Sequence, residues 1–236
     1  MFNKKKEQQL LENELPSLIT LTRPSSVVAE QIRTVRTNIQ FSMIDKDLKT
    51  LVVTSAGPGA GKSTISANLA VTFAMQGKKV LIVDADMRKP TIHKIFRLSN
   101  RDGLTTLLTE RSTEIKNIAH KLDIEGLYVI TSGVIPPNPS ELLASNRMNH
   151  LLSEIEGIFD LIIFDMPPVI AVTDAQIMAS KVDGTIFIIN KDGADKEMVL
   201  KSKELLNKVN SNVLGAVFNR VDTKKDQYYS YYGEGE

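Results

Sequence analysis

Short apolar runs recur along the chain, and stretches whose apolar residues have helical spacing lie between them. Runs of five to seven mostly apolar residues predict strands at 51–55, 79–84, 127–131, 161–165, 184–189 and 213–219. Helical spacing predicts helices near 62–76, 139–156, 174–181 and 195–209. Continuous apolar strands that alternate with helices are typical of parallel sheets buried on both sides. The pattern therefore predicts an α/β fold in three layers, with a mostly parallel twisted sheet and helices on both faces.

The two ends of the chain lack this alternation. Residues 1–23 are polar and irregular, which predicts an N-terminal arm. Pro24 opens a helical pattern that runs to about residue 43, with apolar residues at 28, 32, 35, 39 and 43. Residues 24–221 are then one domain, as expected for a chain of 236 residues. Residues 222–236 have no core periodicity and predict a flexible C-terminal tail.

Composition removes several classes of function. The chain is 42% hydrophobic and 24% charged, which is ordinary for a globular protein. Its net charge of +1 gives no reason to expect nucleic acid as a partner. The absence of cysteine excludes disulfides, thiol catalysis and thiolate metal sites. No apolar run reaches the ~18 residues of a membrane span. No apolar segment follows the basic start, so we expect a cytoplasmic protein.

A glycine-rich segment at 55–64, Ser-Ala-Gly-Pro-Gly-Ala-Gly-Lys-Ser-Thr, follows the first predicted strand and opens a predicted helix. This is the context of a phosphate-binding loop (P-loop), in which backbone N–H groups and a helix N-terminus surround phosphate oxygens. In such loops the lysine reaches the β and γ phosphates of ATP, and the serine hydroxyl binds Mg²⁺. The expected nucleotide contacts are Gly57, Pro58, Gly59, Ala60, Gly61, Lys62, Ser63 and Thr64. A lysine in place of the third glycine excludes a dinucleotide fingerprint.

Carboxylates end two of the predicted strands, Asp84 after 80–83 and Asp165 after 161–164. Beside a P-loop, carboxylates at such strand ends hold Mg²⁺ directly or through water. The predicted metal ligands are therefore Ser63, Asp84 and Asp165. The alternative is that each aspartate caps the helix that follows it.

Asp86 and Arg88 follow Asp84 at spacings of two residues. Either Asp84 or Asp86 is placed to accept a proton from an attacking hydroxyl. Arg88 would neutralise charge in the transition state or pin the loop. The predicted catalytic residues are Lys62, Asp84, Asp86 and Arg88.

Tyrosines gather in the predicted tail. The chain has five, and four of them are Tyr228, Tyr229, Tyr231 and Tyr232. A buried core does not require tyrosines in a polar terminus. Phosphorylation would add about −1.5 to −2 charges at each. Next to a P-loop, the cluster favours a phosphate acceptor over an aromatic docking segment.

Together these segments resemble the bacterial tyrosine kinases (BY-kinases) of capsule and exopolysaccharide operons, in the form whose cytosolic kinase is a separate polypeptide. The likeness extends over essentially the whole chain. The P-loop resembles the family's Walker A, residues 84–88 its Walker A′ (Asp-x-Asp-x-Arg) and residues 162–167 its Walker B. The segment 136–143 is similar to one that is common in these kinases. The tail resembles their tyrosine cluster, and the family's Glu-x-x-Arg-x-x-Arg element is matched by Glu30, Arg33 and Arg36.

The resemblance implies a P-loop NTPase fold and a protein-tyrosine kinase that uses ATP and Mg²⁺. It implies phosphorylation of the tail tyrosines, largely between neighbouring subunits of an octameric ring held by Glu30, Arg33 and Arg36. It also implies activation by the cytosolic tail of a membrane-embedded modulator, which would bring the kinase to the inner face of the plasma membrane. A cognate tyrosine phosphatase would complete a cycle that controls polysaccharide synthesis and export.

The main alternative is a switch ATPase of the ParA/MinD type without kinase activity. The loop of those proteins resembles Lys-Gly-Gly-x-Gly-Lys, and the lysine that crosses their dimer interface is replaced here by Gly57. A scaffold that binds nucleotide and docks through its aromatic tail is a second alternative. The motifs of eukaryotic-type kinases, His-Arg-Asp and Asp-Phe-Gly, do not occur in the sequence.

The expected preference for adenine over guanine in the nucleotide depends on one residue. No Asn-Lys-x-Asp guanine motif is present, which weakens GTP as the nucleotide. Related ATPases contact adenine through an asparagine that ends the last core strand, the place that Asn219 has here. The alternative is an ordinary turn residue.

Overall fold

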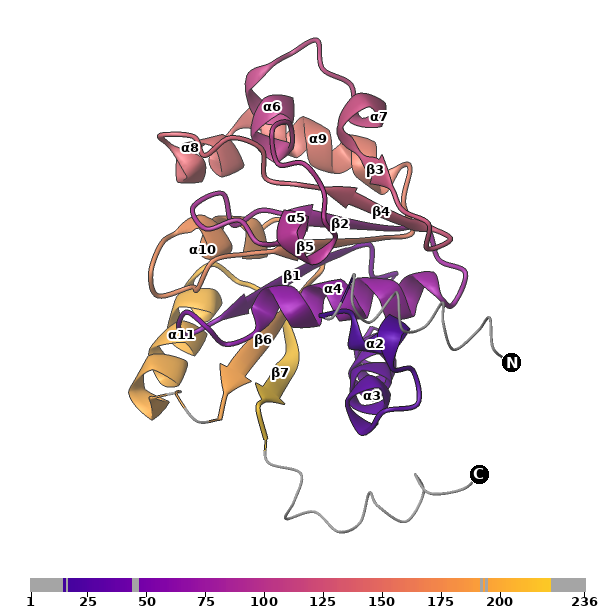
Figure 1. Ribbon diagram of the computed structural model, residues 1–236. Coiled ribbons are helices and arrows are strands. Elements are labelled where there is room, and N and C mark those ends of the chain that lie inside the picture. The colour runs from indigo at the N-terminus through magenta and orange to yellow at the C-terminus, as the bar shows by residue number, and fades with distance from the viewer. Residues whose placement is uncertain (1–14, 16, 44–46, 192, 194, 222–236) are drawn as a thin grey trace, which may run out of the picture.

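The computed structural model of the chain describes residue 15 and residues 17–43, 47–191, 193 and 195–221 (Figure 1). The predicted tail, with its four tyrosines, lies outside the described residues, as does most of the predicted N-terminal arm. The division into arm, domain and tail therefore stays a prediction.

A seven-stranded sheet forms the centre of the described part, in the order β3-β4-β2-β5-β1-β6-β7 (Figure 1). Only β3 runs antiparallel to its neighbour among these strands, and the other pairs are parallel. This confirms the predicted mostly parallel sheet. The strands are β1 (Thr50–Ser55), β2 (Val80–Asp84), β3 (His120–Lys121), β4 (Leu127–Ile130), β5 (Leu161–Asp165), β6 (Gly184–Asn190) and β7 (Val213–Asn219).

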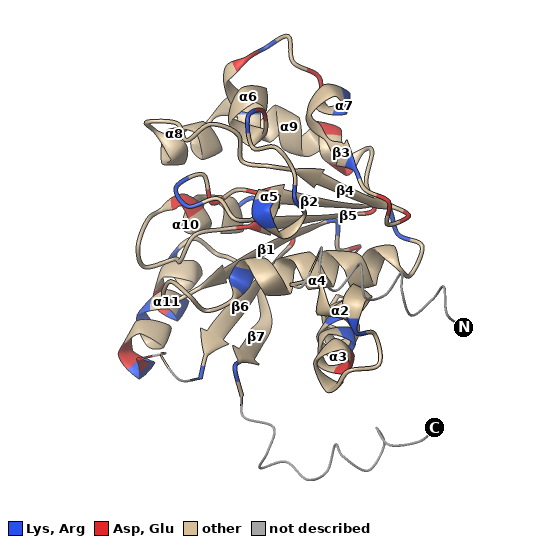
Figure 2. Cartoon of the chain, in the orientation of Figure 1, with Lys and Arg blue, Asp and Glu red and all other residues tan. Residues whose placement is uncertain are grey.

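Helices cover both faces of the sheet, as predicted. The helices are α2 (Ile19–Thr22), α3 (Val27–Phe41), α4 (Lys62–Ala74), α5 (Ile92–Ile95), α6 (Leu104–Thr109), α7 (Ile115–Ile118), α8 (Pro139–Ala144), α9 (Asn146–Glu156), α10 (Asp174–Ala179) and α11 (Lys196–Lys208). Alternate side chains of one strand enter two different cores, because successive strand residues point to opposite faces. Leu51 and Val53 pack with α3 and α4, whereas Val52 packs with α8 to α11. The charged residues lie mainly on the surrounding helices and loops (Figure 2).

The local differences from the predicted elements have simple causes. The single helix predicted at 139–156 is two helices, because Ser145 takes an extended conformation (φ −68°, ψ 157°) and accepts a hydrogen bond from the Met148 N–H at 3.2 Å. The helix predicted from Pro24 begins at Val27, capped by the Ser26 hydroxyl. The elements α5, α6, α7 and β3 have two to six residues each, too short to show a period in the sequence.

Part of the predicted N-terminal arm is packed against α4. Asn68 accepts hydrogen bonds from the Thr20 N–H at 3.0 Å and from the Thr20 hydroxyl at 2.9 Å. Its amide also donates to the Ser17 carbonyl at 2.7 Å, and Leu18 is fully buried. Residues 17–20 are therefore fixed against α4.

The strand order decides where the chemistry lies. Because β1, β5 and β2 are neighbours and parallel, their carboxyl ends meet at one edge. That edge carries the P-loop after β1, Asp84 at the end of β2 and Asp165 at the end of β5. Ligands of open α/β sheets bind at this edge.

Candidate nucleotide and magnesium site

The P-loop connects β1 directly to α4. Gly59 (φ 72°) and Gly61 (φ 87°) have left-handed backbone conformations, which residues with a Cβ rarely adopt. Gly61 is the N-cap of α4, and no side chain caps the first N–H groups of the helix. Uncapped N–H groups at the start of a 13-residue helix form an anion site, so the loop has the geometry that phosphate binding requires.

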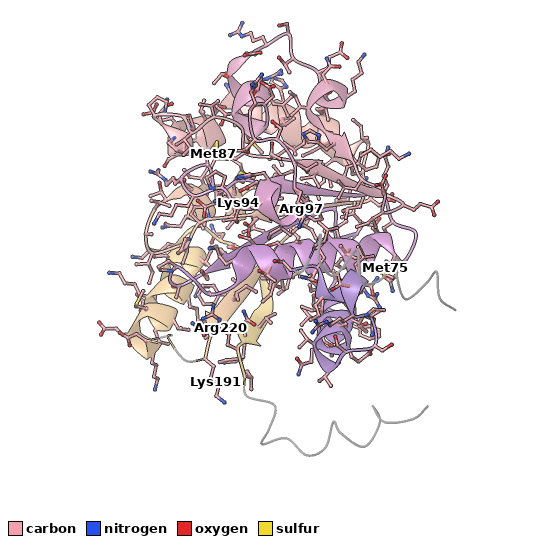
Figure 3. The ribbon with its side chains drawn as sticks, viewed as in Figure 1. Met75, Met87, Lys94, Arg97, Lys191 and Arg220 are labelled. Atoms are coloured by element: carbon pink, nitrogen blue, oxygen red, sulfur yellow. The ribbon has the colours of Figure 1, made fainter. Side chains whose placement is uncertain are left out.

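Asn219 supports this loop from the end of β7. Its amide donates to the Ala60 carbonyl at 2.8 Å, and a Cβ added to Gly61 would collide with the same amide nitrogen. The Lys191 N–H donates to the Asn219 carbonyl at 3.1 Å, which ties β6 to β7 at the same place. Figure 3 shows Lys191 and Arg220 close together at these strand ends. Asn219 thus lies at the P-loop, while its contact with adenine stays a prediction.

We predict that Gly61→Ala removes nucleotide binding and that Gly57→Ala largely preserves it. Alanine at position 61 combines the clash with Asn219 and a left-handed backbone, which costs about 1–2 kcal/mol by itself. At Gly57 the new methyl group would meet only the Met198 methyl at 3.6 Å, an ordinary contact. Titration with a fluorescent ATP analogue compares the two variants, and equal losses in both would contradict this reading of the loop.

Ser63 is hydrogen-bonded to one carboxylate and one threonine. Its hydroxyl donates to Asp165 Oδ2 at 2.5 Å and accepts from the Thr91 hydroxyl at 2.7 Å. The Ser66 hydroxyl lies 3.1 Å from the other oxygen of Asp165. Asp165 is fully buried, and these two serine hydroxyls hold it against α4, the helix that the P-loop opens.

Asp84 lies beside Asp165, since the two residues are register partners across β2 and β5. One oxygen of Asp84 accepts the N–H groups of Thr91 and Ile92, each at 2.9 Å. The other oxygen, Oδ1, is buried and has no hydrogen-bond partner in the described part of the chain. A buried carboxylate oxygen without a donor is unfavourable, and it fits a group that binds a cation.

The two carboxyls perturb each other. Burial raises the pKa of Asp165 to about 6, against the hydrogen bonds from Ser63 and Ser66 and the charge of Lys62. Burial, and then the neighbouring Asp165 charge, raise the pKa of Asp84 well above its usual range. When burial disfavours the ionised form of two neighbouring carboxyl groups, a cation between them would stabilise that form.

These residues fit Mg²⁺ in the form in which nucleotide enzymes hold it. Over the described ranges, no three histidines, cysteines or acidic residues converge into a complete metal cage. Ser63, Asp84 and Asp165 offer one hydroxyl and two carboxylates. Mg²⁺ commonly takes one or two carboxylates and completes its shell with phosphate oxygens and water. The predicted ligands therefore lie together, and metal binding by them stays a prediction.

Asp86 and Lys62 complete the inner part of the site. The Asp86 side chain is 7% exposed and accepts the Lys89 N–H at 3.0 Å. Burial raises its pKa, and the positive charge of Lys62 acts in the opposite direction. Lys62 is itself buried, so its charge interacts with Asp86 and Asp165 with little solvent between them.

Arg88 makes contacts that its sequence motif does not disclose. Its guanidinium donates from Nε to Asp174 Oδ2 at 2.9 Å and from Nη2 to Asp174 Oδ1 at 3.1 Å. Nη2 also donates to the Ser140 hydroxyl at 3.0 Å. Of its two predicted roles, these bonds fit pinning of the loop. Thr91, Ser140 and Asp174 were not predicted, since a serine or aspartate at a helix start looks like an ordinary cap.

The predicted oligomerisation residues lie on α3, outside this site. Arg33 pairs with Glu30 at 2.7 Å and donates to the Pro24 carbonyl at 2.6 Å. Arg36 instead reaches the Thr72 carbonyl of α4 at 3.2 Å, and burial lowers its pKa. Glu30 and Arg33 are thus on the outer side of α3, whereas Arg36 also joins α3 to α4.

Comparison with known proteins agrees with this geometry. A family model described as an AAA domain matches residues 48–213. The tyrosine-protein kinase YwqD of Bacillus subtilis is 46% identical over 217 residues, which cover 92% of this chain and 91% of that protein.

Two solved structures have the same fold and related sequences. The chimerical protein CapA2B2 has a TM-score of 0.84 at 41% identity, over 91% of this chain and 99% of that one. The kinase domain of the Escherichia coli tyrosine kinase ETK has a TM-score of 0.84 at 33% identity, over 88% of this chain and 81% of that one. The described helices include none with the length and hydropathy of a bilayer span.

Proposed function

Because the chain belongs to the family of bacterial tyrosine-protein kinases built on a P-loop domain, we propose that it transfers phosphate from Mg-ATP to the tyrosines of its own C-terminal tail. One observation carries the proposal within the site: Ser63, Asp84 and Asp165 converge next to the P-loop, and Asp84 keeps a buried oxygen without a donor. Bound Mg²⁺ would draw charge from the phosphates. The acceptors Tyr228, Tyr229, Tyr231 and Tyr232 lie outside the described residues.

The roles of the protein residues follow from their burial. The first N–H groups of α4 and Lys62 hold the phosphates, and Ser63, Asp84 and Asp165 hold the metal. Asp84 uses one oxygen for two backbone N–H groups, and its other oxygen faces the metal position. Asp86 then remains to accept the proton of the tyrosine hydroxyl. Burial raises the pKa of Asp86, which makes its carboxylate a stronger base than an exposed one.

The outer side of α3 supports contact with a second copy of the chain. A groove of about 890 Å³ lies between α3 and β7, and both Glu30 and Arg33 line it. Phe218, on β7 at the edge of the sheet, is 64% exposed in the same groove. We assign this groove to the interface of the homo-oligomeric ring, which brings the tail of one subunit to the site of its neighbour.

We predict that Arg33→Ala converts the ring into smaller species in sedimentation velocity. The substitution removes a half-buried charge and its bond to Pro24, whereas the contact of Arg36 with α4 is kept. Lys116→Ala, which removes a lysine exposed on α7, is the matched control. An Arg33→Ala variant that sediments like the wild type, or an Arg33→Ala, Arg36→Ala pair that stays a full ring, would refute the interface.

The remaining parts of the proposal concern partners and place. We propose that the cytosolic tail of a membrane-embedded modulator activates the kinase and holds it at the inner face of the plasma membrane. We propose that a cognate tyrosine phosphatase reverses the modification. The cycle would regulate the synthesis and export of capsular or extracellular polysaccharide.

The test is phosphotyrosine formation by purified protein in Mg-ATP, with and without a modulator tail fused to it. Lys62→Met is the matched control, because it removes the phosphate-binding charge and keeps most of the length of the side chain. Phosphotyrosine that requires Lys62 supports the proposal, and a higher rate in the fusion supports the activator. Hydrolysis of ATP without any phosphotyrosine, even in the fusion, would favour a switch ATPase related to MinD and ParA.

A further inference from the structure

Asp174 is a fully buried carboxylate that the P-loop, Walker A′ and Walker B motifs do not include. It is the first residue of α10, beyond β5. Both of its oxygens accept from Arg88, Oδ2 from Nε at 2.9 Å and Oδ1 from Nη2 at 3.1 Å. This two-point contact fixes the plane of the guanidinium, as a single contact would not.

Ser140 closes the arrangement from α8. Its hydroxyl donates to Asp174 Oδ1 at 2.6 Å and accepts from Arg88 Nη2 at 3.0 Å. Asp174, Ser140 and Arg88 therefore form a triangle that joins α10, α8 and the loop after β2. Met87, the residue before Arg88, is fully buried and is labelled in Figure 3. The backbone next to Arg88 is thus anchored in the core, and its guanidinium is held by Asp174 and Ser140.

The triangle leaves part of the guanidinium available. Nε and Nη2 carry three N–H groups, and Asp174 and Ser140 accept from these nitrogens. Nη1 carries two more, for which no acceptor exists among the residues that the structure describes. The Arg88 side chain is 39% exposed, so a ligand can approach the guanidinium. An oriented guanidinium edge is suited to oxygens of a phosphoryl group.

We propose that Asp174 and Ser140 are positioning residues of the phosphoryl transfer: they orient Arg88 so that its Nη1 edge receives an oxygen of the phosphoryl group that moves to tyrosine. The inference rests on the proposed kinase function. Asp174 does not touch the substrate and acts only through Arg88. The positioning role also explains why a carboxylate is fully buried at the start of the six-residue helix α10.

Asp174→Asn tests the inference, because asparagine keeps the shape of the side chain. It removes the negative charge and one of the two oxygens that accept from the Arg88 guanidinium. We expect kcat for tail phosphorylation to fall about 10- to 100-fold, with KM for ATP changed by less than about twofold. Ser140→Ala should give a smaller loss in kcat. Glu114→Gln, which removes an exposed carboxylate at the start of α7, should leave both constants unchanged.

A double variant separates positioning from damage to the fold. If Asp174 acts only through Arg88, Asp174→Asn added to Arg88→Gln should lower kcat no further than Arg88→Gln alone. Losses that multiply, or a fall in the amount of ATP bound per protein that accounts for the activity lost, would overturn the inference.

The inference and the proposed function fail in different ways. A wild-type protein that forms no phosphotyrosine contradicts the kinase. A wild-type protein that forms it, beside an Asp174→Asn variant of equal kcat, contradicts the positioning role alone. Phenylglyoxal gives an additional readout, because loss of the triangle should speed modification of Arg88 in Asp174→Asn. An unchanged rate of that modification would overturn the inference.

Discussion

Replacing Asp84 by asparagine is expected to remove tyrosine phosphorylation while making the metal-free protein more stable. For activity, the substitution removes a carboxylate from the proposed Mg²⁺ site. Metal stabilisation of transition-state charge is worth several kcal/mol, so the rate should fall by about 10³-fold. Phosphotyrosine formation at saturating ATP measures this part.

The gain in stability follows from the sign of the pKa changes. Burial raises the pKa of Asp165 to about 6 and that of Asp84 well above its usual range. A carboxyl with a higher pKa in the folded than in the unfolded chain contributes stability that is full at low pH. That contribution is lost as the pH rises through the folded pKa. Without metal, the wild type should therefore become less stable as the pH rises from about 4 through about 6, where Asp165 ionises, and less stable again as Asp84 ionises.

Asparagine relieves this loss. Its oxygen can still accept the N–H groups of Thr91 and Ile92, and the uncharged amide carries no negative charge at the buried position of the Asp84 Oδ1. In EDTA near pH 8 we expect the unfolding free energy to rise by at least about 1 kcal/mol, which raises Tm by about 2–4 °C. Asp123→Asn, at an exposed position, should change neither Tm nor activity. A less stable Asp84→Asn protein would contradict the account of the buried pair.

Mixing two inactive variants is expected to restore phosphorylation. Lys62→Met keeps the acceptor tyrosines and lacks the phosphate-binding lysine. A chain with phenylalanine at 228, 229, 231 and 232 keeps the active site and lacks the acceptors. Neither should form phosphotyrosine alone. In the mixture, phosphate should appear on the Lys62→Met chains if, as proposed, the tail of one subunit enters the site of its neighbour.

The mixture also tests the ring. Adding Arg33→Ala to the phenylalanine variant should slow the restored reaction, since the transfer depends on contact between subunits. The two chains are separated by size through a tag on one of them before phosphotyrosine is measured. Phosphate on isolated, monomeric wild-type chains at undiminished rate would contradict transfer in trans.

The fold was predictable because the apolar pattern of its strands is regular along the sequence. Strands buried on both faces are continuously apolar, as in 161–164, and this pattern can be recognised in the sequence without knowing which helices pack on the strands. The short elements between β2 and β4 were not predictable. A four-residue helix such as α5 is fixed by its contacts, with Ile92 fully buried and its N–H bound to Asp84, rather than by a period.

The site divides in the same way. The P-loop and the carboxylates at the strand ends follow from topology, because parallel neighbours bring their carboxyl ends together. Ser140, Thr91 and Asp174 could not be inferred, since their role depends on which distant segments meet. Arg36 shows the converse case, in which the spacing of residues suggests a role that the structure only partly supports. Its spacing from Glu30 and Arg33 suggests one exposed stripe, yet its guanidinium reaches Thr72 within the chain.

Mapping of phosphate by mass spectrometry after incubation with Mg-ATP tests the central claim most directly. The chain supplies an internal control in Tyr128, a half-buried residue of β4. Its ring packs edge-to-face on Phe159, with 5.3 Å between the ring centroids. We predict phosphate on Tyr228, Tyr229, Tyr231 or Tyr232, none on Tyr128 and none anywhere in Lys62→Met. Hydrolysis of ATP with no phosphate on the tail, in the presence of the modulator segment, would contradict the claim.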